Sequence, residues 1–353
     1  GMGGAGALLL ELLEQVALAA GEIARRLDGD LDVHVAVAVG AHHRHALALQ
    51  AELLAGLGPL RDLHLGLLAG ESGHVELAAE RSLQVMAVFV LTPCFPDASE
   101  RHYRFMLEGL RNASTRLARR GIPLAVIPGD PPEEIIRASL KAALVVTDAG
   151  HTRILRQWRR RVAEEISCPL IEVETNLVVP VDEASQKEEY GAYTLRPRLH
   201  RKIPDFMGNP PAIEVRRPLK KSLFPSLDLD DIPAIMARMK ISRAVGPAAF
   251  QGGQTEARRR LRLFLDTRLE RYDTDRNDPS LDGLSGMSPY LHFGQISPVE
   301  IALNVMRRGG AGADPYLEEL IVRRELAANF VRHNPRYDSI ACLPDWARQT
   351  LER

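Results

Sequence analysis

Several features that would mark a membrane, secreted or metal-binding protein are missing from this chain of 353 residues. No uninterrupted apolar run reaches the roughly 18 residues of a membrane span, and no series at the start is typical of a secretory signal. The three cysteines, Cys94, Cys168 and Cys342, lie far apart without Cys-x-x-Cys spacing, which argues against a zinc site or a disulfide framework. We therefore expect a cytoplasmic protein without a metal site, whose cysteines are buried small hydrophobic residues.

Motifs of three common enzyme classes are missing as well. The chain contains no Gly-x-Ser-x-Gly nucleophile elbow, no Walker phosphate loop and no His-Glu-x-x-His zinc motif. These absences argue against a serine hydrolase, a nucleoside triphosphatase and a zinc protease, respectively. Any chemistry must therefore come from another kind of site.

The first 83 residues lack the side chains that usually build a domain core. Residues 1–83 contain no lysine, phenylalanine, tyrosine or tryptophan and a single proline, Pro59. Aromatic side chains supply much of the buried area of ordinary cores, so we treat this range as an atypical N-terminal segment. Two interpretations stay open: a lineage-specific extension, and translation in a shifted reading frame of a GC-rich gene. Residues 33–39 nevertheless have a strand-like pattern, and residues 8–26 have helical spacing.

The net charge of −1 conceals a local imbalance. From Lys187 to Arg262 there are 16 Lys and Arg residues against 8 Asp and Glu. Such an asymmetry is typical of a surface that binds a polyanion. A solvated face that also carries basic helices explains it equally well from the sequence alone.

Residues 84–180 alternate between short apolar runs and amphipathic stretches. Strands are predicted at 85–91, 124–127, 144–147 and 170–173, with helices at 100–120, from Pro131 onward and across 154–162. Continuous apolar runs suit strands that are buried on both faces of a parallel sheet. The alternation predicts right-handed crossovers and an α/β domain with a Rossmann-like sheet.

Two further regions follow this domain. Residues 181–250 are rich in proline, charge and turn signals, which predicts an interdomain linker. Across residues 251–353 the apolar spacing is helical, and Thr255 is the predicted N-cap of the first helix. The second domain is therefore expected to be all-α.

Residues 283–297 read GLSGMSPYLHFGQIS and place glycine, serine and proline just ahead of a helical pattern. Such a turn forms a helix N-terminus that can receive a phosphate, with hydroxyls from Ser285 and Ser288 and close backbone approach at Gly286. Local helix capping by serine is the alternative, and it is the commoner one for an isolated motif. His292, between aromatic neighbours, is expected to be a core histidine rather than a ligand.

The flanks of this motif resemble a known family. RYDTDRNDP precedes it at 271–279, YLEELIVRRELAANF follows at 316–330, and NPRYDS and LPDWA stand at 334–339 and 343–347. Together these runs closely resemble the flavin-binding domain of class II cyclobutane pyrimidine dimer photolyases, within the photolyase/cryptochrome family. The resemblance extends back to about residue 85 and includes ASQKEEY at 184–190 in the linker.

The resemblance implies where flavin adenine dinucleotide (FAD) would bind. Tyr272 and Arg276 would reach its phosphates, and Glu319 and Arg323 would contact flavin or substrate from one face of the following helix. A routine surface pair between Glu319 and Arg323 is the alternative, and Arg324 is expected to be a buried or snorkelling charge. The loop residues that would line the phosphates and ribityl chain are Leu284, Ser285, Gly286, Met287 and Ser288.

The resemblance also implies an activity, that of a deoxyribodipyrimidine photo-lyase. Such an enzyme repairs pyrimidine dimers in DNA with light and an electron from reduced FAD, and its α/β domain can hold an antenna chromophore, here of unknown identity. We expect dimer-containing DNA as the partner, with no membrane and no obligate protein partner. The family has further helices after the LPDWA run that complete the flavin pocket, so we expect a truncated helical domain and assign no catalytic residue. A cryptochrome-like photoreceptor and a non-catalytic DNA-binding fragment are the alternatives.

Overall fold

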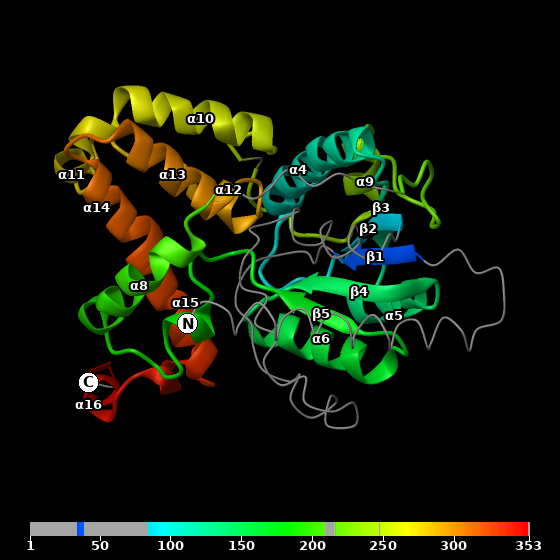
Figure 1. The fold of residues 1–353 in the computed structure, drawn as a ribbon, viewed down its shortest axis with the longest axis horizontal. Coiled ribbons are helices and arrows are strands. Elements are labelled where there is room, and N and C mark those ends of the chain that lie inside the picture. The colour runs from blue at the N-terminus through cyan, green and yellow to red at the C-terminus, as the bar shows by residue number, and fades with distance from the viewer. Residues whose placement is uncertain (1–33, 39–83, 209–214, 216, 247, 352–353) are drawn as a thin grey trace, which may run out of the picture.

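The computed structural model describes residues 34–38, 84–208, 215, 217–246 and 248–351. A parallel sheet of five strands and a group of helices lie side by side (Figure 1). The strand order is β3-β2-β1-β4-β5, which is a doubly wound order. The strands are β1 (His34–Ala38), β2 (Gln84–Leu91), β3 (Leu124–Pro128), β4 (Ala142–Asp148) and β5 (Leu170–Val173).

Helices cover both faces of the sheet because β2 is apolar on both sides. Val85, Ala87 and Phe89 face the side covered by α4 (Glu100–Arg119) and α9 (Ile232–Arg238), whereas Met86 and Val88 face α5 (Pro131–Ser139) and α6 (Arg153–Glu165). The continuous apolar run that predicted a doubly covered strand thus produces two core layers. Figure 1 shows α4 on one face and α5 and α6 on the other.

Most elements predicted for the α/β domain are confirmed within a residue or two. The predicted strand at 33–39 is present as β1, between β2 and β4 at the centre of the sheet, while the helix predicted at 8–26 lies outside the described residues. The prediction of three buried cysteines is wrong: Cys94 is exposed in the loop after β2, and Cys168 and Cys342 are only half-buried. Polar, turn-forming surroundings place that loop at the surface regardless of the thiol.

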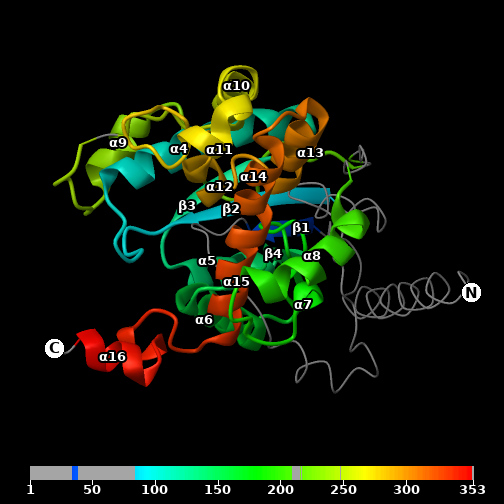
Figure 2. The same cartoon turned by 90° about the vertical axis from the view of Figure 1, so that its left-hand side faces the viewer.

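The second part is helical, as predicted (Figure 2), and its apolar core also includes Phe105 from α4. Its N-cap prediction is wrong, because α10 begins at Gln254 and is capped by Gly253, with Thr255 already inside the helix. The predicted linker contains α8, whose Leu195 and Leu199 are fully buried in the helical core. The domain limits at 83, 180 and 250 stay predictions. The helices are α7 (Val181–Ala184), α8 (Ala192–Phe206), α10 (Gln254–Thr267), η2 (Leu269–Arg271), α11 (Tyr272–Asp275), α12 (Ser288–His292), α13 (Pro298–Arg308), α14 (Ala313–Leu317), η3 (Glu318–Arg323), α15 (Arg324–His333), η4 (Ile340–Cys342) and α16 (Asp345–Leu351).

The described part of the chain contains neither a membrane-spanning helix nor a group of metal-binding side chains. None of its helices combines the length and the apolar character that crossing a membrane requires. Nor do three or more His, Cys, Asp or Glu side chains gather there in a way that could hold a metal ion.

Candidate functional site

The loop at 283–288 is held in one shape by close packing against its neighbours. Gly283 is buried, and a Cβ there would lie 3.0 Å from the backbone carbonyl of Asp275. Gly286 has a φ of +67°, which L side chains rarely adopt, and its Cβ position lies 3.2 Å from the Phe250 ring. Both glycines are therefore needed for the loop to reach its position beside α11.

A hydrogen bond from a buried tyrosine fixes the side chain of Ser285. The Tyr316 hydroxyl donates to Ser285 Oγ at 3.0 Å, and the same oxygen accepts from the Met287 N–H at 3.3 Å. Tyr316 packs against the rings of Phe264 and Tyr272, at centroid distances of 4.8 Å and 5.1 Å. Burial raises the pKa of Tyr316, so this hydroxyl remains a neutral donor.

The predicted helix N-terminus is shorter than expected. The helix α12 starts at Ser288 and has five residues, and the Met287 N–H already serves Ser285. A macrodipole from one turn contributes little, so an anion here would be bound by individual donors rather than by the helix as a whole. Leu284 is 55% exposed, whereas Met287 is buried in the helical core.

Arg276 joins two of the predicted site residues. Its Nη1 lies 2.9 Å from Glu319 Oε1, and its guanidinium carbon lies 5.6 Å from the centroid of the Tyr272 ring. Its Nε is buried and has no hydrogen-bond partner among the described residues. The unpaired Nε is a donor that an acceptor such as a phosphate oxygen could use, although Glu319 and Asp273, at 2.9 Å and 4.0 Å, already neutralise part of the charge of Arg276.

Arg323 does not pair with Glu319, the routine partner that the helical spacing allowed. Residues 318–323 form a π-helix, in which the Arg324 N–H bonds to the Glu319 carbonyl five residues back. Arg323 accordingly pairs with Glu318 at 3.2 Å rather than with Glu319. Insertions of this kind are frequent at functional sites, and this one turns Glu319 toward Arg276.

Sequence reasoning placed Tyr272, Arg276, Ser285 and Glu319 together, and the structure brings all four into one chain of contacts through Tyr316. It missed Tyr316 itself, although a tyrosine just ahead of the Glu-Glu pair was the available signal. Arg324 is half-buried with a buried Nη1, which fits the predicted buried charge rather than a snorkelling one. His292 is half-buried against Phe293.

Removing the Tyr316 hydroxyl tests how firmly Ser285 is held. Tyr316→Phe keeps the ring packing and deletes one buried hydrogen bond, so we expect a loss of about 1 kcal/mol in the free energy of unfolding by urea. In a double-mutant cycle with Ser285→Ala, the two losses should be less than additive, because both remove the same bond. Strict additivity would contradict the contact.

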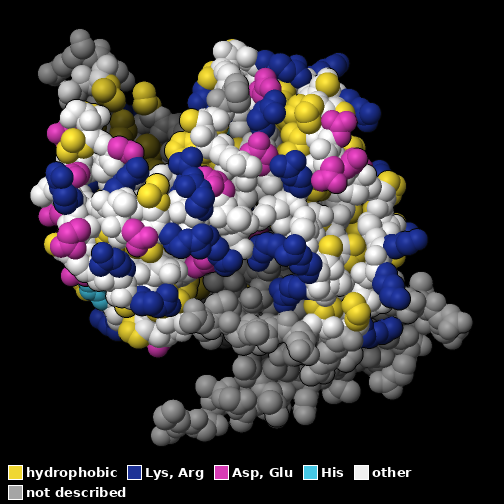
Figure 3. Space-filling model, turned by 90° about the horizontal axis from the view of Figure 1, so that it is seen from above, with side chains coloured by type: hydrophobic (Ala, Val, Ile, Leu, Met, Phe, Trp, Pro, Cys, Tyr) yellow, Lys and Arg dark blue, Asp and Glu magenta, His cyan; other side chains and the backbone are white. Residues whose placement is uncertain are grey.

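The basic surplus between Lys187 and Arg262 is partly neutralised in three dimensions. Figure 3 shows Lys and Arg side chains interspersed with Asp and Glu on one face of the molecule. Cations of this range pair with four carboxylates from outside it, Glu100, Glu183, Glu300 and Glu318, and with Glu189 and Glu256 inside it, so the field that they produce is weaker than the count suggests. The pairs are Arg196–Glu318, Arg198–Glu189, Lys202–Glu183, Arg243–Glu100, Arg258–Glu300 and Glu256 with Arg259 and Arg260.

Comparison with known proteins adds to this geometry. Residues 72–216 match the family model of DNA photolyase. The chain is 43% identical over 282 residues to the deoxyribodipyrimidine photo-lyase of Methanothermobacter thermautotrophicus, covering 78% of this chain and 61% of that protein. The chain thus spans about three fifths of the length of this curated relative.

Two solved structures share the fold at low sequence identity. The cryptochrome of Synechocystis superposes with a TM-score of 0.59 at 18% identity, covering 85% of this chain and 62% of that one. The photolyase of Sulfolobus tokodaii, solved with two FAD molecules, superposes with a TM-score of 0.57 at 18% identity, covering 85% and 60%. With its parallel α/β part, its helical part and these relatives, the chain belongs to the photolyase/cryptochrome family.

Proposed function

We propose that this chain is the α/β and flavin-loop portion of a class II photolyase that repairs cyclobutane pyrimidine dimers in DNA with light. The observation that carries the proposal is the contact chain Tyr272–Arg276–Glu319 and Tyr316–Ser285, built from the runs that resemble class II enzymes. The 43% identity to a deoxyribodipyrimidine photo-lyase supports it. The cytoplasm is the proposed compartment, and dimer-containing DNA the proposed partner.

The residues present fit the pyrophosphate of FAD. The buried Nε of Arg276 lacks a partner among the described residues, Ser285 and Ser288 offer hydroxyls on one loop, and Gly286 permits close backbone approach. Bound reduced FAD would supply the light-excited electron that splits the cyclobutane ring. The chain's own part is to hold the phosphates with Arg276, to orient that guanidinium through Glu319 and Tyr272, and to keep the loop rigid through Tyr316. Leu284, Met287 and Arg323 remain proposed contacts, and an antenna chromophore is proposed for the α/β part.

Flavin retention is the first test. The purified chain is incubated with FAD and desalted, and bands near 370 and 450 nm, typical of protein-bound oxidised flavin, are expected. Arg276→Ala should weaken FAD binding by about 10- to 100-fold, since a hydrogen bond to a charged group contributes about 1.5–3 kcal/mol. Arg271→Ala is the matched control, because the Arg271 side chain is 72% exposed and pairs with its helical neighbour Asp275 at 3.1 Å.

Light-dependent repair separates the proposed function from its alternatives. The flavin-loaded chain and a dimer-containing oligonucleotide are illuminated with near-ultraviolet light, and intact thymine is measured against a dark control. Bound flavin without repair would favour a cryptochrome-like photoreceptor; the cryptochrome of Synechocystis has the same fold as this chain. A chain that retains no flavin but still binds DNA would favour the non-catalytic fragment.

A further inference from the structure

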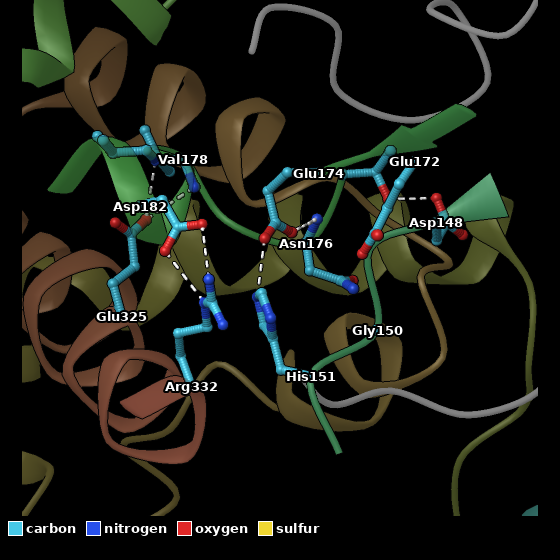
Figure 4. A network of polar contacts seen from close by, with 12 residues as sticks. Asp148, Gly150, His151, Glu172, Glu174, Asn176, Val178, Asp182, Glu325 and Arg332 are labelled. Atoms are coloured by element: carbon cyan, nitrogen blue, oxygen red, sulfur yellow. Dashed lines mark hydrogen bonds and ion pairs between the residues drawn. The ribbon is translucent and has the colours of Figure 1, made fainter. Parts of the chain in front are cut away.

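A buried polar network lies where the chain runs from the last strand of the sheet into the helical part (Figure 4). The chain leaves β5 at Val173, and Val178 and Val179 are already members of the helical core, at 3% and 0% exposure. Residues 174–179, which we name the crossing segment, therefore connect the two parts. Both ends of this segment are held by buried carboxyl groups.

The sheet end is held through Glu174. Its Oε2 lies 2.8 Å from His151 Nε2, and its Oε1 accepts from the Asn176 N–H at 3.1 Å. His151 follows β4 and is 1% exposed. Next to this pair, the Thr175 hydroxyl donates to Asp148 Oδ1 at 2.7 Å. The Glu174–His151 pair thus ties the crossing segment to the loop that follows the neighbouring strand.

The helical end is held through Glu325 on α15. Glu325 is 2% exposed, and its Oε1 accepts from the N–H groups of Val178 at 2.7 Å and Val179 at 3.3 Å. Its Oε2 is buried and has no hydrogen-bond partner among the described residues. Leu177, Val181 and Ala328 form an apolar cluster beside it. A negative charge on this carboxyl would therefore lie in poorly solvating surroundings.

Other charged groups around the two carboxyls are largely committed to one another. Arg159 contacts Glu172 at 2.9 Å, and Arg332 contacts Asp182 at 3.0 Å. Arg324 on α15 favours ionisation of both glutamates, but burial outweighs its effect. Among the described residues, the charged groups around this pair of carboxyls include Asp148 on β4, His151 after it, Arg156 and Arg159 on α6, Glu172 on β5, Asp182 on α7, and Arg324 and Arg332 on α15.

The direction of titration follows from this environment. Burial raises the pKa of Glu174 to about 8, with Glu172 and Asp148 adding to the shift and the Asn176 N–H and Arg324 opposing it. Burial likewise raises the pKa of Glu325 to about 8, against the N–H groups of Val178 and Val179 and the charge of Arg324. Both groups therefore hold their protons at neutral pH while the segment is closed.

We propose that the crossing segment is a proton-linked hinge, closed when Glu174 and Glu325 are protonated and favoured to open when water can ionise them. When the segment is open, water solvates both carboxyls and the pKa of each returns to its ordinary value of 4.5. Closing the segment therefore takes up protons. The free energy that favours the closed state is largest below pH 4.5, decreases as the pH rises from 4.5 to 8, and is constant above pH 8. This inference does not depend on the activity of the chain.

Hydrogen exchange tests the hinge in the chain as it exists. Protection of the backbone at 176–181 is measured by mass spectrometry at pH 6, 7 and 8 and corrected for the intrinsic rate. We expect protection to fall by at least about tenfold from pH 6 to pH 8. In Glu174→Gln/Glu325→Gln the profile should be flat, because glutamine keeps a carbonyl acceptor without titrating. Glu164→Gln, exposed on α6 and paired with Arg160, should keep the wild-type profile.

Two outcomes would overturn the hinge: wild-type protection that does not change with pH, or a pH dependence that survives in the double variant. If the double variant does not fold, titration of the glutamates in the wild-type protein still tests the proposal. Its glutamate side chains, labelled with carbon-13 at the carboxyl, should include two that titrate well above the ordinary value of 4.5. Titration of every glutamate below pH 6 would contradict the proposal.

Discussion

Replacing Gly312 with alanine is expected to lower the free energy of unfolding by about 3 kcal/mol, because small-to-large changes in well-packed places force backbone shifts. Gly312 caps α14 and is buried against η2. A Cβ there would collide with the backbone carbonyl of Leu269 and lie 3.0 Å from Tyr272 Cβ. Backbone atoms of a buried turn cannot rotate away as a side chain end does. The strain would therefore push apart the turn that carries Tyr272 and the helix that carries Tyr316.

Thermal unfolding measures this effect, with an expected drop of about 4 °C in the melting temperature of a chain of 353 residues. Gly246→Ala is the matched control, since Gly246 is exposed and no atom lies within 4 Å of its Cβ position; it should change stability by less than about 0.5 kcal/mol. Equal stability of Gly312→Ala and Gly246→Ala would show that α14 and η2 are not packed as closely as described. A flavin-binding defect in Gly312→Ala alone would further link this packing to the loop site.

Local patterns predicted the α/β part well because each of its elements is specified by nearby residues. The strand at 84–91 is a continuous apolar run, and α4 has an apolar stripe that ends at Gly121, where φ is +73°. Such signals are carried by period and by turn chemistry. Even the weak valine pattern near residue 35 was sufficient to indicate β1, although nothing local placed it at the centre of the sheet.

The parts that the sequence did not predict depend on contacts between distant residues. The spacing of Glu319 and Arg323 suits an α-helix, yet Arg196 holds Glu318 and Arg276 holds Glu319, and the segment becomes a π-helix. The bond from Tyr316 to Ser285 spans 31 residues. Local propensity does not encode such pairings. The sequence thus identified which residues gather at the site, but not how the helix turns them.

Replacing Arg332 with alanine should destabilise the protein by about 3 kcal/mol, because removal of one partner leaves a buried charge uncompensated. Arg332 on α15 makes two hydrogen bonds to Asp182 on α7, at 3.0 Å and 3.2 Å. Their side chains are only 14% and 10% exposed. The pair lies beside the crossing segment and fastens α15 to the chain that leaves the sheet (Figure 4).

A cycle of variants separates the pair from the burial of its members. Urea unfolding is measured for Arg332→Ala, Asp182→Ala and the double variant. The double variant should be less destabilised than the sum of the single ones by about 1–3 kcal/mol, since it leaves neither charge without a partner. Arg160→Ala on α6 removes an exposed pair with Glu164 and should change stability by less than about 0.5 kcal/mol. If Arg332→Ala behaves like Arg160→Ala, water already solvates Asp182, and the junction between α7 and α15 is more open than its buried contacts indicate.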